Sequence, residues 1–99
     1  MKSNDYKKLS FDSKSRRYYL QDPNGHNINF LTCGTHVTFE LLDRQEDIYE
    51  EKEGVIQYSS FVSRGYYISF DSGKSYMPLF CLERLTLRGE NLWQKKSLN

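Results

Sequence analysis

A thiol and an imidazole stand close together at one point of this sequence. Cys33 and His36 are three positions apart, while His26 and Cys81 lie elsewhere along the chain. Such groups could ligate a metal, or act as a nucleophile and its base. Structural zinc sites usually show two short Cys/His spacings, and only one such spacing is present here. A catalytic cysteine needs a base that a third group orients, and nothing in the sequence identifies a group that would orient His36. We expect no metal, no cofactor and no catalytic residues, with Cys33 buried at a strand entry and His36 facing outward.

The order Gly73-Lys74-Ser75 matches the end of a phosphate-binding loop. The complete motif requires a glycine at position 68, where this chain has Ile68, and the loop must open a helix. We therefore interpret residues 72–75 as a turn between two strands.

Residues 43–53 form the most acidic segment, with six acidic and two basic side chains. We expect an extended acidic loop, which would contain a helical turn at most. One interpretation is a solvated loop that keeps the protein soluble. The other is a protein-binding surface that imitates nucleic-acid phosphates and occupies a basic groove of its partner. That surface would comprise Asp43, Glu46, Asp47, Tyr49, Glu50, Glu51 and Glu53.

A second candidate surface mixes arginine with tyrosine. Cations that pair with phosphates, beside rings that stack on bases, are the means by which proteins bind single-stranded nucleic acid. The alternative is that one tyrosine of each pair is part of the core and the other covers a neighbouring strand. The formal net charge of +1 favours no class of partner. The residues of this alternative surface are Arg16, Arg17, Tyr18, Tyr19 and Tyr67, with Tyr66 and Tyr76 as possible extensions.

Short segments that alternate apolar and polar residues must position these groups. Alternation with a period of two, interrupted by turn residues, predicts antiparallel strands. The spacing of the segments predicts an all-β fold, an SH3-like or OB-like barrel of about six short strands with an acidic loop and a short C-terminal tail. Val37, Phe39 and Leu41 should face its core. Strand character is present in residues 8–12, 16–21, 28–31, 36–42, 54–58, 66–71, 76–79 and 83–88.

The length of 99 residues allows one domain. We expect a flexible N-terminus (residues 1–7), a single barrel domain (8–89) and a tail (90–99). Trp93 in that tail either folds back over an open end of the sheet or is an exposed anchor. The N-terminus resembles no secretory signal and no apolar run reaches transmembrane length, so we expect a cytoplasmic protein with free thiols and no membrane partner.

From about Arg16 to Arg88 the chain resembles a family of small uncharacterised β-barrel proteins from mobile elements of Gram-positive bacteria. The residues that carry the resemblance are Arg17-Tyr18-Tyr19, Leu31-Thr32-Cys33-Gly34, Gly54-Val55-Ile56-Gln57-Tyr58, Gly65-Tyr66-Tyr67-Ile68 and Leu85-Thr86-Leu87-Arg88. The acidic segment 43–53 and the two tails depart from the family pattern. The resemblance implies a compact barrel and a plasmid, integrative-element or phage setting, but no functional residues.

These observations lead to one main hypothesis and one alternative. The main hypothesis is a non-catalytic protein-binding module of a mobile element that inhibits a host defence nuclease, such as a CRISPR effector. The alternative is a small nucleic-acid-binding barrel. Both leave the oligomeric state open.

Overall fold

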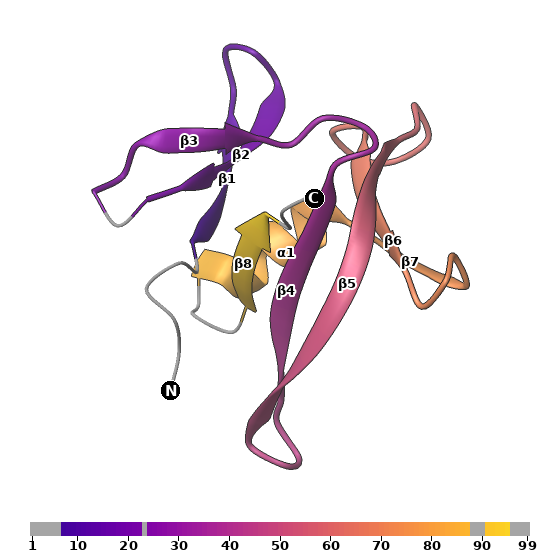
Figure 1. Cartoon of the computed structure of the whole chain (residues 1–99). Coiled ribbons are helices and arrows are strands. Elements are labelled where there is room, and N and C mark those ends of the chain that lie inside the picture. The colour runs from indigo at the N-terminus through magenta and orange to yellow at the C-terminus, as the bar shows by residue number, and fades with distance from the viewer. Residues whose placement is uncertain (1–6, 23, 88–90, 96–99) are drawn as a thin grey trace.

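The computed structural model describes residues 7–22, 24–87 and 91–95. They form eight strands and one helix (Figure 1). The elements are β1 (Lys8–Asp12), β2 (Arg17–Gln21), β3 (Asn27–Phe30), β4 (His36–Asp43), β5 (Ile48–Tyr58), β6 (Tyr66–Phe70), β7 (Ser75–Pro78), α1 (Leu79–Leu87) and β8 (Asn91–Lys95).

The strands are antiparallel and form two sheets. One has the order β1-β2-β3 and the other β7-β6-β5-β4-β8. A short bridge between Lys7 and Trp93 joins the two sheets. The backbone N–H of Lys7 donates to the carbonyl of Trp93 at 2.7 Å, and the N–H of Trp93 donates to the carbonyl of Lys7 at 3.2 Å. The prediction of antiparallel β structure is confirmed, whereas the prediction of a barrel is wrong. Over the described residues β3 and β7 have no common ladder that would close the sheets into a ring.

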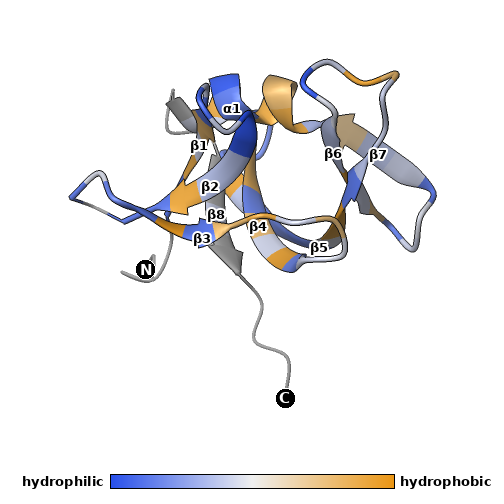
Figure 2. Ribbon diagram, turned by 90° about the horizontal axis from the view of Figure 1, so that it is seen from above, coloured by the Kyte–Doolittle hydropathy of each residue, from blue (hydrophilic) through white to orange (hydrophobic). Residues whose placement is uncertain are grey.

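The helix α1 takes the place of the strand that we expected at residues 83–88. It contacts β1, β6, β7 and β8, and lies across the space between the two sheets (Figure 2). Leu79, Leu82 and Thr86 are its buried residues, and their spacing of three and four positions places them on one helical face. The short alternation around Thr86 predicted a strand. The segment is a helix instead, because the helical spacing of its buried residues covers a complete face.

The core lies between the sheets and α1. Phe39 of β4 stacks on Trp93 of β8 with ring centroids 5.1 Å apart, so Trp93 is buried and is not an exposed anchor. Val37 and Phe39 are buried as predicted, and Leu41 is partly buried against the core. The fully buried apolar side chains are Leu9, Tyr18, Leu20, Leu31, Val37, Phe39, Ile56, Ile68, Leu79, Leu82 and Trp93.

The acidic segment is part of a β-hairpin, so the prediction of an extended loop is wrong. β4 and β5 pair from His36↔Val55 to Asp43↔Ile48, and only residues 44–47 form the turn. β8 pairs with β4 only as far as Leu41, and β6 pairs with β5 only from Gly54 onward. Glutamate has a low preference for strands, but the ladder to β4 overrides it. Residues 42–49 therefore extend beyond β6 and β8 (Figure 1), and residues 50–53 of β5 pair with β4 alone over the described residues. We call residues 42–53 the acidic arm.

Local turn chemistry is largely as predicted. β1 and β2 form a hairpin with Leu9 opposite Leu20. In the turn after β2, Asp22 accepts the N–H groups of Asn24 and His26 at 2.9 Å, and Gly25 has a φ of 87°. These bonds, led by the one from His26, hold the pKa of Asp22 below its usual value. Pro23 of this turn lies outside the described residues, as do residues 1–6 of the predicted flexible N-terminus and residues 90 and 96–99 of the predicted tail. Residues 91–95, by contrast, belong to the sheet as β8.

Candidate functional site

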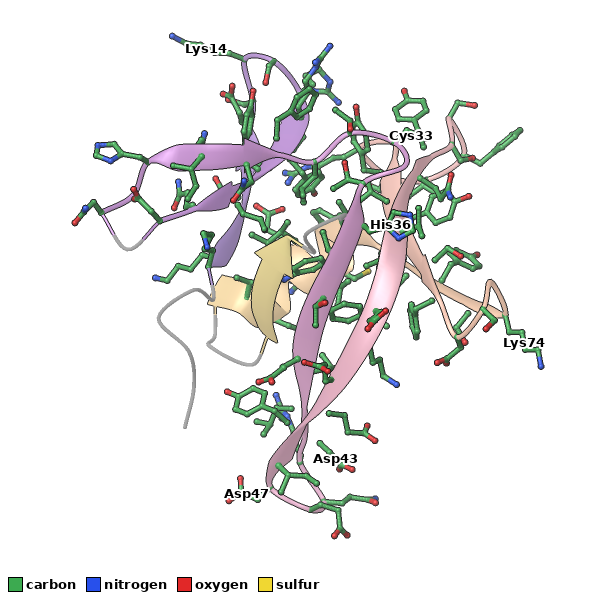
Figure 3. All side chains as sticks on the ribbon, in the orientation of Figure 1. Lys14, Cys33, His36, Asp43, Asp47 and Lys74 are labelled. Carbon is green, nitrogen blue, oxygen red and sulfur yellow. The ribbon has the colours of Figure 1, made fainter. Side chains whose placement is uncertain are left out.

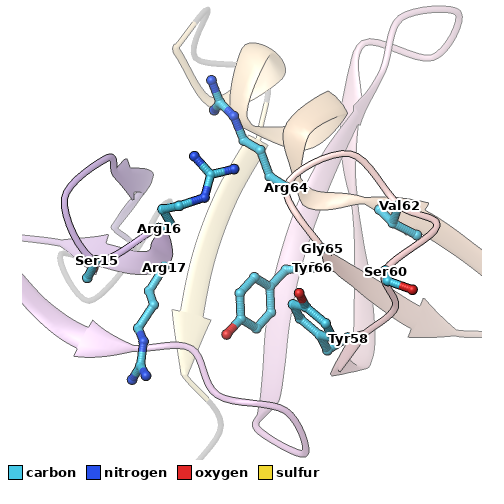
Figure 4. Close-up of a pocket in the computed structure, with 9 residues that line it drawn as sticks. All are labelled: Ser15, Arg16, Arg17, Tyr58, Ser60, Val62, Arg64, Gly65 and Tyr66. Atoms are coloured by element: carbon cyan, nitrogen blue, oxygen red, sulfur yellow. The ribbon is translucent and has the colours of Figure 1, made fainter.

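Three arginines from two segments of the chain line a cleft of about 470 Å³ (Figure 4). Arg16 belongs to the β1–β2 turn, Arg17 begins β2, and Arg64 lies in the loop between β5 and β6. Aspartate and glutamate do not contribute to the lining among the described residues. We call this site the arginine cleft. Its lining residues are Ser15, Arg16, Arg17, Tyr58, Ser60, Val62, Arg64, Gly65 and Tyr66.

The β1–β2 turn holds Arg16 in a defined position. Asp12 accepts the hydroxyl of Ser15 at 2.8 Å and the N–H of Lys14 at 3.2 Å, and its carbonyl accepts the N–H of Arg16 at 2.7 Å. The bond from Ser15, followed by the bond from Lys14, lowers the pKa of the Asp12 carboxyl. Arg16 has a φ of 56°, a left-handed conformation that these bonds support.

The opposite wall is a loop closed by its own backbone bonds. The N–H of Gly65 donates to the carbonyl of Val62 at 2.8 Å, and the N–H of Ser59 donates to the carbonyl of Gly65 at 2.8 Å. Gly65 has a φ of 85°, and the Tyr58 ring occupies the space that a Cβ at this position would need. Glycine is therefore required here both for the backbone conformation and for the approach of the ring.

The Arg64 guanidinium is paired with other side chains of the protein and forms one wall of the cleft. Its Nη1 donates to Oε1 of Glu83 at 2.7 Å, and its guanidinium lies 4.3 Å from the Phe11 ring centroid and 4.9 Å from that of Phe80. The Tyr18 hydroxyl donates to the same oxygen of Glu83 at 3.2 Å. Burial raises the pKa of Tyr18 to about 12; the charge of Glu83 adds to this effect and Arg64 opposes it.

Arg16 and Arg17 differ from Arg64 because neither pairs with a carboxylate among the described residues. Their contacts are with rings: the Arg16 guanidinium lies 6.0 Å from the Phe11 centroid, and that of Arg17 lies 4.7 Å from the Phe30 centroid. Both arginines are exposed. Guanidinium groups bind phosphate through paired hydrogen bonds, so two uncompensated arginines make this cleft suitable for an anion.

The residues predicted for nucleic-acid binding are only partly brought together. Arg16 and Arg17 line the cleft, but Tyr18 is fully buried, so the prediction that it stacks on a base is wrong. Tyr18 and Leu20 occupy the positions of β2 that face the core, which leaves the alternate positions to Arg17 and Tyr19. Tyr19 packs on Phe30 with centroids 5.4 Å apart.

Tyr67 lies apart from the arginine cleft and contacts Tyr76 instead. Sequence reasoning missed Tyr58 and Arg64, and treated Tyr66 only as a possible extension. The sequence feature that could have indicated these residues is the presence of a tyrosine-containing strand on either side of Arg64-Gly65.

The acidic arm distributes the predicted protein-binding residues over two faces and a tip. Glu51 is directly opposite Glu40 on one face, where Glu53 and Tyr49 also lie. Glu50 is opposite Leu41 on the other face. Asp43, Glu46 and Asp47 are at the tip, remote from the β3–β4 turn that contains Cys33 (Figure 3). Glu40, which the sequence analysis did not include, therefore extends the acidic face toward the body.

Asp43 has a structural role at this tip. Its Oδ1 accepts the N–H of Gln45 at 3.0 Å, and its carbonyl accepts the N–H of Asp47 at 2.7 Å. Asp47 has a φ of 57°, which aspartate tolerates better than most residues.

The thiol and the imidazole do not form a site. Cys33 is exposed, so the prediction that it is buried is wrong: it lies in a turn that Thr32 and Thr35 close by mutual hydrogen bonds. Its Sγ donates to Oε1 of Gln57 at 3.6 Å. His36 faces outward as predicted. Within the part of the chain that the structure describes, no three His, Cys, Asp or Glu side chains gather as a metal site, and both cysteines are free.

Comparison of the chain with protein-family models, with curated proteins and with solved structures produced no match in any of the three. The resemblance to the mobile-element family therefore stays a prediction. Over residues 7–22, 24–87 and 91–95, no helix has the length and apolarity that crossing a membrane requires.

Proposed function

We propose that this protein is a non-catalytic binding protein that takes single-stranded nucleic acid into the arginine cleft. The observation that carries the proposal is the pair Arg16 and Arg17, exposed and without a carboxylate partner among the described residues, at a cleft that also presents Tyr58 and Tyr66. Arginine for phosphates and tyrosine for bases is the combination used by proteins that bind single strands.

The dimensions and rings of the cleft favour a single strand over a duplex. Its volume of about 470 Å³ is in the range of pockets for small molecules. Tyr58 is 57% exposed, and its ring packs edge-on against Tyr66 at 5.1 Å. A ring can stack only on an unstacked base, which single strands offer and duplexes do not.

The test is the salt dependence of binding to fluorescently labelled single-stranded DNA and RNA, measured by anisotropy. For single strands the slope of log K against log salt is about −0.7 for each phosphate contact. Replacing both arginines, as R16A/R17A, should weaken binding and reduce the magnitude of the slope by about 1.4. The matched control is K8A/R84A, which removes the same charge at two exposed positions outside the cleft.

Two results would contradict this proposal. One is the absence of binding to either oligonucleotide at low salt. The other is binding that R16A/R17A and K8A/R84A weaken equally, because the cleft would then contribute no more than net charge.

A second candidate function rests on the acidic arm. Glu40 and Glu51 are directly opposite each other, and like charges in a cross-strand pair destabilise a hairpin. Between Ile48 and Glu53, β5 pairs with β4 alone over the described residues. A cationic partner surface would attract the carboxylates of this face. We therefore also propose a protein-binding module whose arm enters a basic groove of a nucleic-acid-binding protein, for which the mobile-element resemblance suggests a host defence nuclease.

The arm hypothesis predicts capture of a protein from bacterial lysate after nuclease treatment. The captured protein should be released by added single-stranded DNA, because both occupy the same groove. Neutralising the acidic face, as E40Q/E51Q/E53Q, should abolish capture, whereas E50Q on the opposite face should not. Capture that persists in the triple variant would contradict the hypothesis, and capture that vanishes with nuclease would instead indicate nucleic acid.

A further inference from the structure

A second hollow lies on the other side of the β5–β6 loop. It has a volume of about 350 Å³, and we call it the aromatic groove. Phe61 at its edge is 97% exposed and Tyr76 is 66% exposed. Contiguous exposed apolar side chains mark interaction surfaces or ligand-binding grooves, unlike apolar side chains that are scattered singly. The lining residues are Ser59, Phe61, Val62, Tyr67, Ser69, Gly73 and Tyr76.

Two strands and a hydrogen-bonded loop form the groove. Tyr67 of β6 and Tyr76 of β7 pack edge-on, with centroids 5.6 Å apart and an interplanar angle of 76°. The backbone N–H of Phe61 donates to Oγ of Ser59 at 3.2 Å, and the N–H of Val62 donates to the Ser59 carbonyl at 3.1 Å. These bonds hold the loop in the turn that presents Phe61. Among the residues that the structure describes, the lining contains serine and aromatic residues but no charged side chain.

The groove and the arginine cleft share one wall. Val62 lines both hollows. Along the preceding residues the lining alternates, since Tyr58 and Ser60 line the cleft while Ser59 and Phe61 line the groove. The loop is therefore a narrow ridge with a cationic cleft on one side and a neutral aromatic groove on the other.

We propose that the aromatic groove binds bases of the same single strand whose phosphates lie on Arg16 and Arg17, with Phe61 and Tyr76 as the stacking rings. This inference rests on the proposed function. A strand that crosses the ridge meets cations first and then uncharged rings, which matches the separate chemistry of its phosphates and bases. Every base has an aromatic face, so stacking on these rings is tolerant of sequence.

The experiment compares a labelled oligothymidine with an abasic oligonucleotide of the same number of phosphates. F61A and Y76A should each weaken binding of the oligothymidine by roughly 5- to 150-fold, the range found for loss of one stacked base. Binding of the abasic strand should not change, and the salt slope should stay that of the wild type because the phosphate contacts remain. Both residues are exposed, so the variants should fold, which circular dichroism verifies.

The control is I48A, which removes an exposed apolar side chain from the acidic arm and should bind like the wild type. Unchanged binding of the oligothymidine by F61A and Y76A would overturn the inference, while the R16A/R17A effect upholds the proposed function. Loss of abasic binding in F61A would also overturn it, because the ring would then not act through bases. Failure of both oligonucleotides to bind would refute both proposals. Capture of a protein that F61A abolishes, with oligonucleotide binding intact, would replace the inference by a protein-docking role for this groove.

Discussion

The indole Nε1–H of Trp93 donates to Oγ1 of Thr86 at 3.0 Å, which ties β8 to α1 inside the core. The Thr86 hydroxyl in turn donates to the carbonyl of Leu82 at 3.0 Å. Both side chains are buried, so the indole N–H depends on the Thr86 hydroxyl for its hydrogen bond. This contact joins the two elements that the sequence analysis did not anticipate.

Replacing Thr86 by valine should destabilise the protein by about 1–3 kcal/mol, because the indole N–H would be buried without an acceptor. Urea denaturation of T86V, W93F and the double variant measures the coupling between the two residues. We expect the double variant to lose less stability than the sum of the single variants, since W93F removes the donor that T86V leaves unpaired. Strict additivity would show that the hydrogen bond contributes nothing.

Alkaline pH should reduce stability through Tyr18. Its pKa is about 12 in the folded protein against an ordinary value of 10.0, so the folded state prefers the protonated phenol. Below pH 10 this contribution is fully present. Between pH 10 and pH 12 the unfolded chain ionises first and stability falls, by up to about 1.4 kcal/mol for each pH unit. Urea denaturation across this range should show a shallower decline for Y18F than for the wild type, and parallel declines would contradict the assignment.

Replacing Gly65 by alanine should disturb the arginine cleft as well as the fold. The left-handed φ of 85° costs a residue with a Cβ about 1–3 kcal/mol, and the added methyl must also displace the Tyr58 ring. Gly25 has a similar φ of 87° with open space around it, so G25A carries the backbone cost alone. Thermal denaturation should rank G65A as the less stable variant. Equal stabilities would show that the ring moves aside without cost.

The variant E51K should stabilise the acidic arm. It places a cation opposite Glu40, and replacing a like-charge pair by an opposite-charge pair should contribute about 0.2–1 kcal/mol. The gain should shrink at high salt because the arm is open to solvent. E50K, opposite Leu41, is the control and should lack this gain. A destabilised E51K would show that Glu51 has a favourable contact that its position opposite Glu40 does not reveal.

The local pattern of apolar and polar residues was sufficient to predict the positions of most strands. β1, β2, β4, β6 and β7 lie where alternation and turn residues predict them, because a strand with one buried face shows its period of two directly in the chain. The turn that contains Gly25 could also be predicted, because its residues are neighbours in the chain. Arg16 and Arg17 were also recognised, since adjacent residues need no fold to bring them near each other.

Tertiary structure decided the elements whose sequence is ambiguous on its own. Residues 83–87 alternate over too short a span to distinguish a strand from a helix, and α1 forms because Leu82 and Thr86 complete a face that covers the sheets. Glutamate-rich β5 becomes a strand because β4 offers a ladder.

The candidate site depends on tertiary structure in the same way. Arg64 and Tyr58 reach Arg16 only when the β5–β6 loop and the β1–β2 turn meet. The sequence by itself determined which segments alternate and which residues carry charge. Only the tertiary structure decided which segments become neighbours, because contacts between distant residues leave no period in the chain.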